Sequence, residues 1–434
     1  MNERALQEVT LPPQHHVLRR MWRHPLLMHY WRLAVAVVLT NVIIIVVMMA
    51  NVDTSLVGLP TSALADLMLG NFAVAFVVRQ QRVINLFFWL ATRVPKHWPL
   101  SVRWTAGKVY HFGGLHVGGF FVGTLLLGAL VVRWYLESAA VSVLVIGTTL
   151  LLVLLAMIIT SLPAIRYPRH DLFERVARFG TWASLPLFWV LTALILTPEG
   201  EAFTLLHPQY LVLALITLSV ILPWLRLRRV PVDIHRPSGH VAIADFDHGV
   251  TPFAGSSTEL SRSPLLEWHS FANVPSPDRE GFRLTISRAG DWTGSFISDA
   301  PEHIWVKGIP TAGVGNIETL FHKVLWIATG SGIGPCLPHL LKQEVPAHLV
   351  WSTRDPRVTY GDELVEEILS VQPDAVIWNT QVDGKPDMVR LAYQAYVESG
   401  AEAVICISNR KLTWEVVYGL ESRGIPAFGA IWDS

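Results

Sequence analysis

The chain has 434 residues, of which 51% are hydrophobic and only 16% are charged, and its formal net charge is zero. This composition is too apolar for an ordinary soluble domain, and the balanced charge gives no sign of a nucleic-acid partner or an acidic one. The two cysteines, Cys336 and Cys406, lie far apart in the more polar second half, which argues against a disulfide framework and fits a reducing compartment.

Six runs in the first half are apolar enough to span a bilayer, which takes about twenty residues each. The first is not a signal peptide, because it is long, follows a segment rich in Arg and His, and lacks a small-residue cleavage site. We therefore predict a bundle of six transmembrane helices. The runs cover residues 33–50, 62–78 with a continuation to 90, 112–132, 140–162, 179–196 and 205–225.

The loop charges predict the orientation of this bundle. Lys and Arg are frequent in the N-terminal segment, in the second and fourth loops and at the exit near Arg226, whereas the first and fifth loops contain none. By the positive-inside rule, both termini are cytoplasmic. We expect a multi-pass integral protein of the plasma (inner) membrane, with the lipid bilayer as its partner.

The second half predicts two further units. Residues 235–318 hold short runs such as "HVAIADF" and "RLTISRA", punctuated by Pro, Gly and Ser, which are typical of a small antiparallel β-barrel. From residue 324 onward, buried strands alternate four times with amphipathic helices, which predicts an α/β unit with a parallel sheet. The predicted divisions are 1–30 for a cytosolic N-terminal segment, 31–228 for the bundle, 229–318 for the barrel and 319–434 for the α/β unit.

A glycine-rich loop follows the first strand of the predicted parallel sheet, in "VLWIATGSGIGP". Glycines there let backbone amides approach a pyrophosphate at the start of the next helix, where anions are favoured, and a proline in the first turn costs no hydrogen bond. A simple tight turn is the alternative. The candidate nucleotide-binding residues are Gly330, Ser331, Gly332, Ile333, Gly334 and Pro335.

The next strand ends in "VWSTRDPRVTYGDEL", at the edge of the sheet where ligands bind. The hydroxyls of Ser352 and Thr353 and the guanidinium of Arg354 suit a 2′-phosphate, since arginine forms bidentate charge-assisted bonds. Tyr360 could stack on adenine. These residues predict NADPH, or NADH, as cofactor, and a solvated loop with an exposed Arg354 is the alternative.

Three segments carry a resemblance to a known superfamily. In order and spacing, "LLEWHSFANVPSP", "ISRAGDWTGSF" and "VLWIATGSGIGP" resemble the FAD and NADPH segments of the ferredoxin-NADP reductases, and in particular of the membrane-bound NADPH oxidases and ferric reductases. The run "LADLMLGNFAVAFVVRQQRVINLFFWL" resembles the second helix of the oxidases. The whole chain is most similar to the TmpA-type integral membrane flavoproteins, which implies a ferric-reductase-like bundle, an FAD-binding barrel and an NADP-binding α/β unit.

The resemblance also implies flavin contacts. His269, Ser270 and Phe271 take the place of the FAD-binding His-Pro-Phe-Thr, and Ala272 replaces its threonine, which removes one hydrogen bond to the flavin. The implied groups for the flavin pyrophosphate are Arg283 and Arg288, with a solvated strand edge as the alternative.

The C-terminal part of the resemblance concerns the nicotinamide. Cys406 falls where the family keeps a cysteine near that ring, although "CISNR" replaces Cys-Gly-Pro. The resemblance implies that Trp432 or Phe428 is the aromatic that covers the isoalloxazine, and a plain core aromatic is the alternative.

The bundle departs from the family at its haem ligands. The family holds haems between histidines of its third and fifth helices, but the fifth predicted helix here has none. His111 and His116 point about 140° apart on one helix and cannot ligate opposite faces of one iron. Haem is therefore doubtful, an unconventional set with His170 or His29 stays open, and we predict no metal site.

These observations predict a membrane flavoprotein oxidoreductase that passes electrons from NAD(P)H through FAD to an unidentified small-molecule acceptor, without haem. His111 and His116, flanked by glycines inside the bundle, are candidates to bind or protonate a lipophilic acceptor, with two satisfied interhelical histidines as the alternative. The competing functions are a redox-silent scaffold or sensor and a haem-containing ferric reductase or NADPH oxidase. The sequence points to no protein partner.

Overall fold

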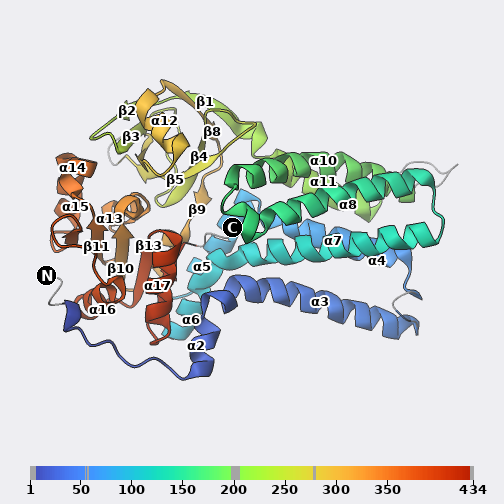
Figure 1. The fold of residues 1–434 in the computed structure, drawn as a ribbon, viewed down its shortest axis with the longest axis horizontal. Coiled ribbons are helices and arrows are strands. Elements are labelled where there is room, and N and C mark those ends of the chain that lie inside the picture. The colour runs from blue at the N-terminus through green and yellow to red at the C-terminus, as the bar shows by residue number, and fades with distance from the viewer. Residues whose placement is uncertain (1–5, 54, 56–57, 197–205, 277–279, 431–434) are drawn as a thin grey trace.

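The computed structural model describes residues 6–53, 55, 58–196, 206–276 and 280–430. Its long helices run side by side at one end of an elongated molecule, and the β-rich units lie at the other end (Figure 1). The helical half contains α2 (Val17–Arg23), η1 (Pro25–Leu27), α3 (His29–Val52), α4 (Thr61–Val77), α5 (Gln81–Thr92), α6 (Leu100–Ala106), η3 (Gly107–Phe112), α7 (Gly113–Leu136), α8 (Val141–Ser161), α9 (Pro163–Arg166), α10 (His170–Leu196), α11 (Pro208–Ile221) and η4 (Trp224–Arg226).

Five helical segments among the described residues are long and apolar enough to cross a membrane, or six if α4 and α5 count as one span. The predicted continuation of the second run to residue 90 is wrong as a single helix, since α5 bends away from α4 by 76°. The bend has a local cause, because the Gln80 side chain accepts hydrogen bonds from the backbone N–H groups of Arg82 and Val83 and caps α5. Ile84 and Phe88 then bury one face of α5 against the β-rich end.

Small residues of α7 let the bundle pack closely. A side chain on Gly118 would lie 2.9 Å from the carbonyl oxygen of Ala34 in α3, and one on Gly119 would lie 2.7 Å from that of Asn71 in α4. Between α3 and α4, the amides of Asn41 and Asn71 exchange two hydrogen bonds, of 3.0 and 2.7 Å. Close backbone approach and paired polar groups are the usual means by which apolar helices associate.

The predicted antiparallel unit is confirmed as two antiparallel sheets around one core. Strand β7 places Leu284 and Ile286 in that core, while its alternate residues face outward. The segment that begins at Gly290 starts helix α12 (Asp291–Asp299). One sheet holds β1 (Leu227–Pro231), β8 (His303–Lys307), β4 (Ser256–Ser261), β5 (His269–Ala272) and β9 (Thr311–Ala312), and the other holds β2 (Asp233–His235), β3 (Val241–Phe246), β7 (Phe282–Ser287) and β6 (Val274–Pro275).

The predicted parallel α/β unit is also confirmed. Its sheet has the order β12 (Val376–Asn379), β11 (Ala347–Thr353), β10 (Val324–Thr329), β13 (Ala403–Ile407) and β14 (Ala427–Gly429), and the short β14 was not predicted. The connections are η5 (Val314–Leu320), η6 (Gly330–Gly332), α13 (Ile333–Lys342), α14 (Pro356–Tyr360), α15 (Asp362–Val371), α16 (Met388–Ser399) and α17 (Arg410–Glu421). Helices α13 and α15 cover one face of the sheet, and α16 and α17 cover the other.

The N-terminal segment lies across the α16 and α17 side of the sheet, which the sequence did not predict. Leu6 is buried in the core beneath these helices. The Arg390 guanidinium donates to the carbonyl of Gln7 at 2.6 Å, and that of Arg423 donates to the carbonyl of Pro12 at 2.9 Å. The N-terminal segment and the α/β unit therefore occupy the same end of the bundle (Figure 1).

Candidate functional site

The glycine-rich loop turns from β10 into α13 through η6. Gly330 has φ +48°, a left-handed conformation that favours glycine, and its carbonyl accepts a hydrogen bond of 3.1 Å from the Trp351 indole. A Cβ on Gly332 would lie 2.1 Å from the carbonyl oxygen of Ile407 at the end of β13. This glycine is therefore required by the packing of the loop on the sheet, whatever else the loop binds.

The outer face of β7 meets this loop across what we call the polar seam, formed by Thr285, Ser287, Gly334 and Tyr360. A Cβ on Gly334 would lie 3.3 Å from the carbonyl oxygen of Thr285, so the two backbones are close. The Thr285 hydroxyl is buried and has no hydrogen-bond partner in the described part of the chain. Burial raises the pKa of Tyr360, and hydrogen bonds with the side chains of Ser287 and Thr353 offset part of this rise.

The residues expected to hold a 2′-phosphate and adenine are only partly brought together, by a hydrogen bond between the side chains of Thr353 and Tyr360. Ser352 and Thr353 are buried at the end of β11, whereas Arg354 is exposed and donates to the side chain of Gln381 at 3.2 Å. Tyr360 is 1% exposed and packs edge-on against Trp351, with ring centroids 4.9 Å apart. Protein already encloses the ring in this structure, and stacking of Tyr360 on adenine stays a prediction.

The expected flavin residues on β5 lie beside α12. The ring of His269 stacks on Trp292 at 4.2 Å between centroids, and Phe271 lies 6.0 Å from the same indole. The Trp292 Nε1 is buried without a partner among the described residues, while Ser270 is exposed. The Thr293 hydroxyl accepts hydrogen bonds from the backbone N–H groups of Ala289 and Gly290, which fixes the start of α12.

Both arginines expected at the flavin pyrophosphate already have protein partners. The Arg283 guanidinium forms an ion pair with Glu367 of α15. The Arg288 guanidinium donates to the carbonyl of Gly239 at 3.1 Å and to the Ser298 hydroxyl at 3.2 Å. The Nε of Arg283 is buried without a partner in the described structure, whereas Arg288 is exposed, so a solvated position stays the alternative for Arg288.

The described residues expected at the nicotinamide and over the flavin, Cys406 and Phe428, are buried. Cys406 is fully buried beneath α16 and α17, where burial raises its thiol pKa to about 12, an effect that a hydrogen bond with Thr413 reduces only in part. Phe428 is fully buried and lies 5.5 Å from Phe321 between ring centroids, as a core aromatic does. Trp432 lies outside the described residues.

The two histidines predicted to lie inside the membrane, His111 and His116, have different surroundings. His116 Nδ1 lies 2.8 Å from the carbonyl oxygen of Ala75 in α4. His111 lies in η3 beside His29, with ring centroids 5.8 Å apart, and its buried Nδ1 has no partner in the described structure. His170 is exposed at the start of α10. Within the described ranges, no group of three or more His, Cys, Asp or Glu side chains is placed to hold a metal ion.

The helical half and the α/β unit meet at what we call the charged junction, formed by Arg103, Lys108, Glu402 and Glu421. The Arg103 guanidinium donates to both carboxylate oxygens of Glu402, at 2.6 and 3.2 Å. The Lys108 ammonium lies 2.6 Å from the Glu421 carboxylate, and both side chains are buried. The sequence analysis missed this junction, because its partners are separated by about three hundred residues.

The sequence analysis also missed Thr285 and Ser287, although a signal was present. In "FRLTIS" the polar residues Arg283, Thr285 and Ser287 alternate with apolar ones. In a strand of period two, this places all three on the face opposite the core. The same alternation therefore predicts a polar outer face, but not that the α/β unit buries it.

Comparison with known proteins finds two similar fungal proteins and a family model. The model described as the C-terminal domain of adenylate-forming reductase 03009 matches residues 314–434. Adenylate-forming reductase 03009 of Coprinopsis cinerea is 41% identical over 431 residues, or 96% of this chain and 41% of that protein. Adenylate-forming reductase 06235 of the same fungus is 39% identical, over 98% of this chain and 42% of that protein.

Solved structures similar to the chain cover about half of it. They include ferredoxin-NADP+ reductase from Plasmodium falciparum, with 11% identity and a TM-score of 0.37 over 48% of this chain and 95% of that one. Another is ferredoxin NADP+ reductase from Neisseria gonorrhoeae with bound FAD and NADP, with 12% identity and a TM-score of 0.36 over 47% of this chain and 98% of that one. Over nearly its whole length, then, the chain is similar to the adenylate-forming reductases 03009 and 06235, and it spans about two fifths of theirs.

Proposed function

We propose that the chain is a membrane-anchored oxidoreductase that passes electrons from NAD(P)H through FAD to a small-molecule acceptor at the membrane, without haem. Within that proposal it belongs with the TmpA-type flavoproteins of the ferric reductase branch. The names of both fungal relatives, which are called reductases, support the class of reaction. Because the chain spans only part of those relatives, the adenylate-forming step in their names is not assigned to it.

The polar seam carries the proposal. A buried hydroxyl without a partner costs about 1–3 kcal/mol, and the seam holds one on β7, that of Thr285. Such groups are retained where a ligand completes their hydrogen bonds. The phosphates or sugar hydroxyls of a dinucleotide supply suitable partners, and the glycine-rich loop across the seam offers backbone amides at the start of α13.

The residues around the seam fit a flavin nucleotide. Thr285 and Ser287 would donate hydrogen bonds to it, and the aromatic faces of His269 and Trp292 on β5 and α12 would lie beside it. When bound, FAD would accept a hydride from the nicotinamide and release electrons singly or in pairs. The buried residues of the polar seam would keep water away from the flavin. Arg283 or Arg288 would exchange a protein partner for a phosphate of the nucleotide.

The arrangement of the helices supports the membrane part of the proposal. The long apolar helices extend away from the β-rich end, and the N-terminal segment lies at that same end (Figure 1). A cytoplasmic location for both termini agrees with the Arg-rich loops on this side. The proposal does not require His111 or His116 to contact the acceptor, and both remain candidates for that role.

The absorption spectrum of the purified full-length chain tests the proposal. We expect a flavin band near about 450 nm that is bleached when NADPH is added in the absence of oxygen. A Soret band would instead support the haem-containing alternative. A protein that stays colourless after incubation with FAD would contradict the proposal.

Two observations favour a second function, a redox-silent scaffold or sensor. Arg283 and Arg288 are already engaged by protein groups, and the Cys406 thiol is buried beneath the helices α16 and α17. A chain that binds FAD or NADPH but shows no bleaching would support this function. The two outcomes therefore separate binding of the cofactors from electron transfer between them.

A further inference from the structure

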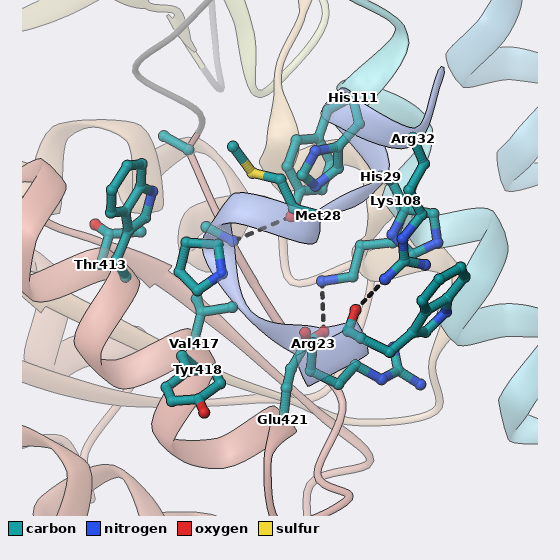
Figure 2. A pocket seen from close by; sticks show the side chains of 16 residues that line it. Arg23, Met28, His29, Arg32, Lys108, His111, Thr413, Val417, Tyr418 and Glu421 are labelled. Carbon is teal, nitrogen blue, oxygen red and sulfur yellow. Dashed lines mark hydrogen bonds and ion pairs between the residues drawn. The ribbon is translucent and has the colours of Figure 1, made fainter. Parts of the chain in front are cut away.

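A cavity of about 50 Å³ lies where the start of α3 meets η3 and α17, at the end of the bundle next to the α/β unit (Figure 2). Its walls come from both halves of the molecule. The side chains that carry the argument are Arg23, His29, Arg32, Lys108, His111 and Glu421.

The charges around this cavity do not cancel. The Glu421 carboxylate is matched by the Lys108 ammonium at 2.6 Å and also accepts a hydrogen bond of 3.0 Å from the Trp104 indole. Arg23 and Arg32 form no ion pair with a carboxylate among the described residues. Their guanidinium groups instead lie over the rings of Trp104 and Trp22, at 3.9 and 3.8 Å from the ring centroids, and that of Arg32 also donates to the backbone carbonyls of Leu27 and Trp22, which leaves its charge unneutralised. Two positive charges are therefore left over at the cavity.

A buried polar atom on the wall also lacks a partner. His111 is 5% exposed, and its Nδ1 makes no hydrogen bond in the described part of the chain. Figure 2 shows His111 on the same side of the cavity as His29 and Arg32. Since buried polar groups are nearly always hydrogen-bonded, an unpartnered nitrogen beside two arginines that have no carboxylate partner indicates a missing anionic or polar ligand.

The surface next to the cavity is apolar and exposed, as at a membrane surface. The short helices α2 and η1 expose apolar side chains beside their arginines, a composition typical of segments that lie in the headgroup region of a bilayer. The same apolar surface continues onto α3 through Trp31, Val35 and Leu39. The exposed apolar residues of α2 and η1 are Val17, Leu18, Met21, Trp22, Leu26 and Leu27.

From this arrangement we propose that the cavity binds the phosphate headgroup of an anionic phospholipid from the cytoplasmic leaflet. Arginine binds phosphate oxygens in bidentate, charge-assisted geometry, and basic clusters beside a transmembrane helix attract anionic lipids. The acyl chains would lie along the apolar surface of α2 and α3. The headgroup would hold the start of α3 to α17, so one lipid would link the bundle to the α/β unit.

This inference rests on the membrane part of the proposed function and not on its redox part. The test therefore measures binding without turnover. Full-length chain in detergent is titrated with phosphatidylserine or phosphatidylcholine, and bound lipids are counted by native mass spectrometry. We expect phosphatidylserine to be retained in preference to phosphatidylcholine. In the double variant Arg23→Gln/Arg32→Gln, we expect this retention to weaken by roughly tenfold or more, since each juxtamembrane arginine contributes about 1 kcal/mol.

A charge-matched control is available on α2, the helix that carries Arg23. Arg19→Gln/Arg20→Gln removes two positive charges from α2 at residues that do not line the cavity, and we expect it to retain phosphatidylserine as the unaltered chain does. Arg23→Lys/Arg32→Lys keeps the charge but loses bidentate geometry, so its retention should be intermediate. If the glutamine variant aggregates in size-exclusion chromatography, the lysine variant alone is used to test the proposal. Retention of phosphatidylserine by the lysine variant at the level of the unaltered chain would then contradict bidentate binding by Arg23 and Arg32.

Three results would overturn the proposal. Equal loss in the Arg19/Arg20 control would mean that net charge alone attracts the lipid. Unchanged retention in the Arg23/Arg32 variant would mean that the lipid binds elsewhere. Displacement of phosphatidylserine by millimolar inorganic phosphate would mean that the site takes a free phosphate. None of these measurements uses NAD(P)H, so they stay valid even if the reductase proposal fails. If the chain is instead soluble without detergent, it is not a membrane protein, and the lipid proposal is overturned.

Discussion

The α/β unit has two polar interfaces that differ in one respect. At the charged junction with the helical half, Arg103, Lys108, Glu402 and Glu421 pair with one another across buried or half-buried surface. At the polar seam with β7, the Thr285 hydroxyl is buried without a partner in the described structure. An interface with satisfied polar groups is sufficient to hold two parts together, whereas one with unsatisfied groups is incomplete until a ligand arrives.

The largest effect should come from breaking the charged junction. In Lys108→Met, the Glu421 carboxylate would stay buried with only the Trp104 indole as donor. Loss of one member of a buried ion pair costs about 3–5 kcal/mol, so we expect a correspondingly lower free energy of unfolding. Denaturant unfolding of the full chain in detergent, followed by tryptophan fluorescence, measures it.

Two control variants show whether the loss of stability in Lys108→Met comes from the buried ion pair. Arg357→Met removes an exposed guanidinium that pairs with Asp362 and Glu366, and should change little. Lys108→Met/Glu421→Gln removes both charges and should regain part of the loss. If Lys108→Met destabilises no more than Arg357→Met, the junction does not hold the two halves together.

A smaller loss should follow from enlarging the glycine-rich loop. In Gly332→Ala, the new methyl group would lie 2.1 Å from the Ile407 carbonyl oxygen and force η6 away from β13. Such overpacking costs about 1–3 kcal/mol, so both thermal stability and NADPH-driven flavin reduction should fall. Gly239→Ala is the control, because nothing lies within 4 Å of its added Cβ. Full stability with lost flavin reduction would instead show that Gly332 acts only through the bound nucleotide.

At the polar seam, unlike at Gly332, we expect one substitution to weaken FAD binding without lowering the stability of the ligand-free chain. Thr285→Val keeps the shape of the side chain and removes an unsatisfied hydroxyl, so the ligand-free chain should be as stable as before or more stable by about 1 kcal/mol. FAD should be retained less tightly, since a hydrogen bond to a charged phosphate contributes about 1.5–3 kcal/mol. Thermal unfolding with and without added FAD measures both quantities.

A partnered hydroxyl gives the matching contrast. The Thr251 hydroxyl accepts a hydrogen bond of 3.0 Å from the backbone N–H of Gly281. Thr251→Val should therefore lower stability and leave FAD retention unchanged. If Thr285→Val behaves in the same way as Thr251→Val, the seam is a structural contact and not a nucleotide site.

Periodicity and glycine chemistry in the sequence predicted most of the fold. The apolar runs, the alternating strands and the four strand-helix repeats each indicate which nearby residues are buried, and this pattern can be seen in a single sequence. The exception in the bundle is Gln80, whose side chain caps α5 and ends the second run within the polar stretch 79–82. The short β14 was missed because only three residues, Ala427–Gly429, form it.

The candidate site was less predictable, because its partners are distant in sequence. The loop at Gly330 could be predicted, since glycines directly after a buried strand indicate a tight turn or a phosphate-binding loop. That Arg283 pairs with Glu367, or that Tyr360 is enclosed by Trp351, depends on how two units dock. From residue type alone, Arg283 and Tyr360 were expected to contact a ligand. In the folded chain their side chains contact other protein groups, which the sequence does not reveal.

The smallest expected effect concerns Glu402, the more exposed carboxylate of the charged junction. Burial alone would raise its pKa, but hydrogen bonds from Arg103 and from the backbone and side chain of His322 lower it from 4.5 to about 2. A pKa lowered in the folded state stabilises the protein at pH values above the ordinary pKa, and this contribution is lost as the pH falls from 4.5 through about 2.

Comparison with Glu402→Gln isolates this contribution. Near neutral pH the variant should have the lower thermal midpoint, and the gap should close across that acidic window, because protonation makes the natural side chain resemble the amide. The Glu402 side chain is 28% exposed, so solvent screening keeps the gap small. A gap that is absent at neutral pH, or that persists unchanged at the acid end, would mean that Lys108 and Glu421 alone provide the electrostatic stability of the junction.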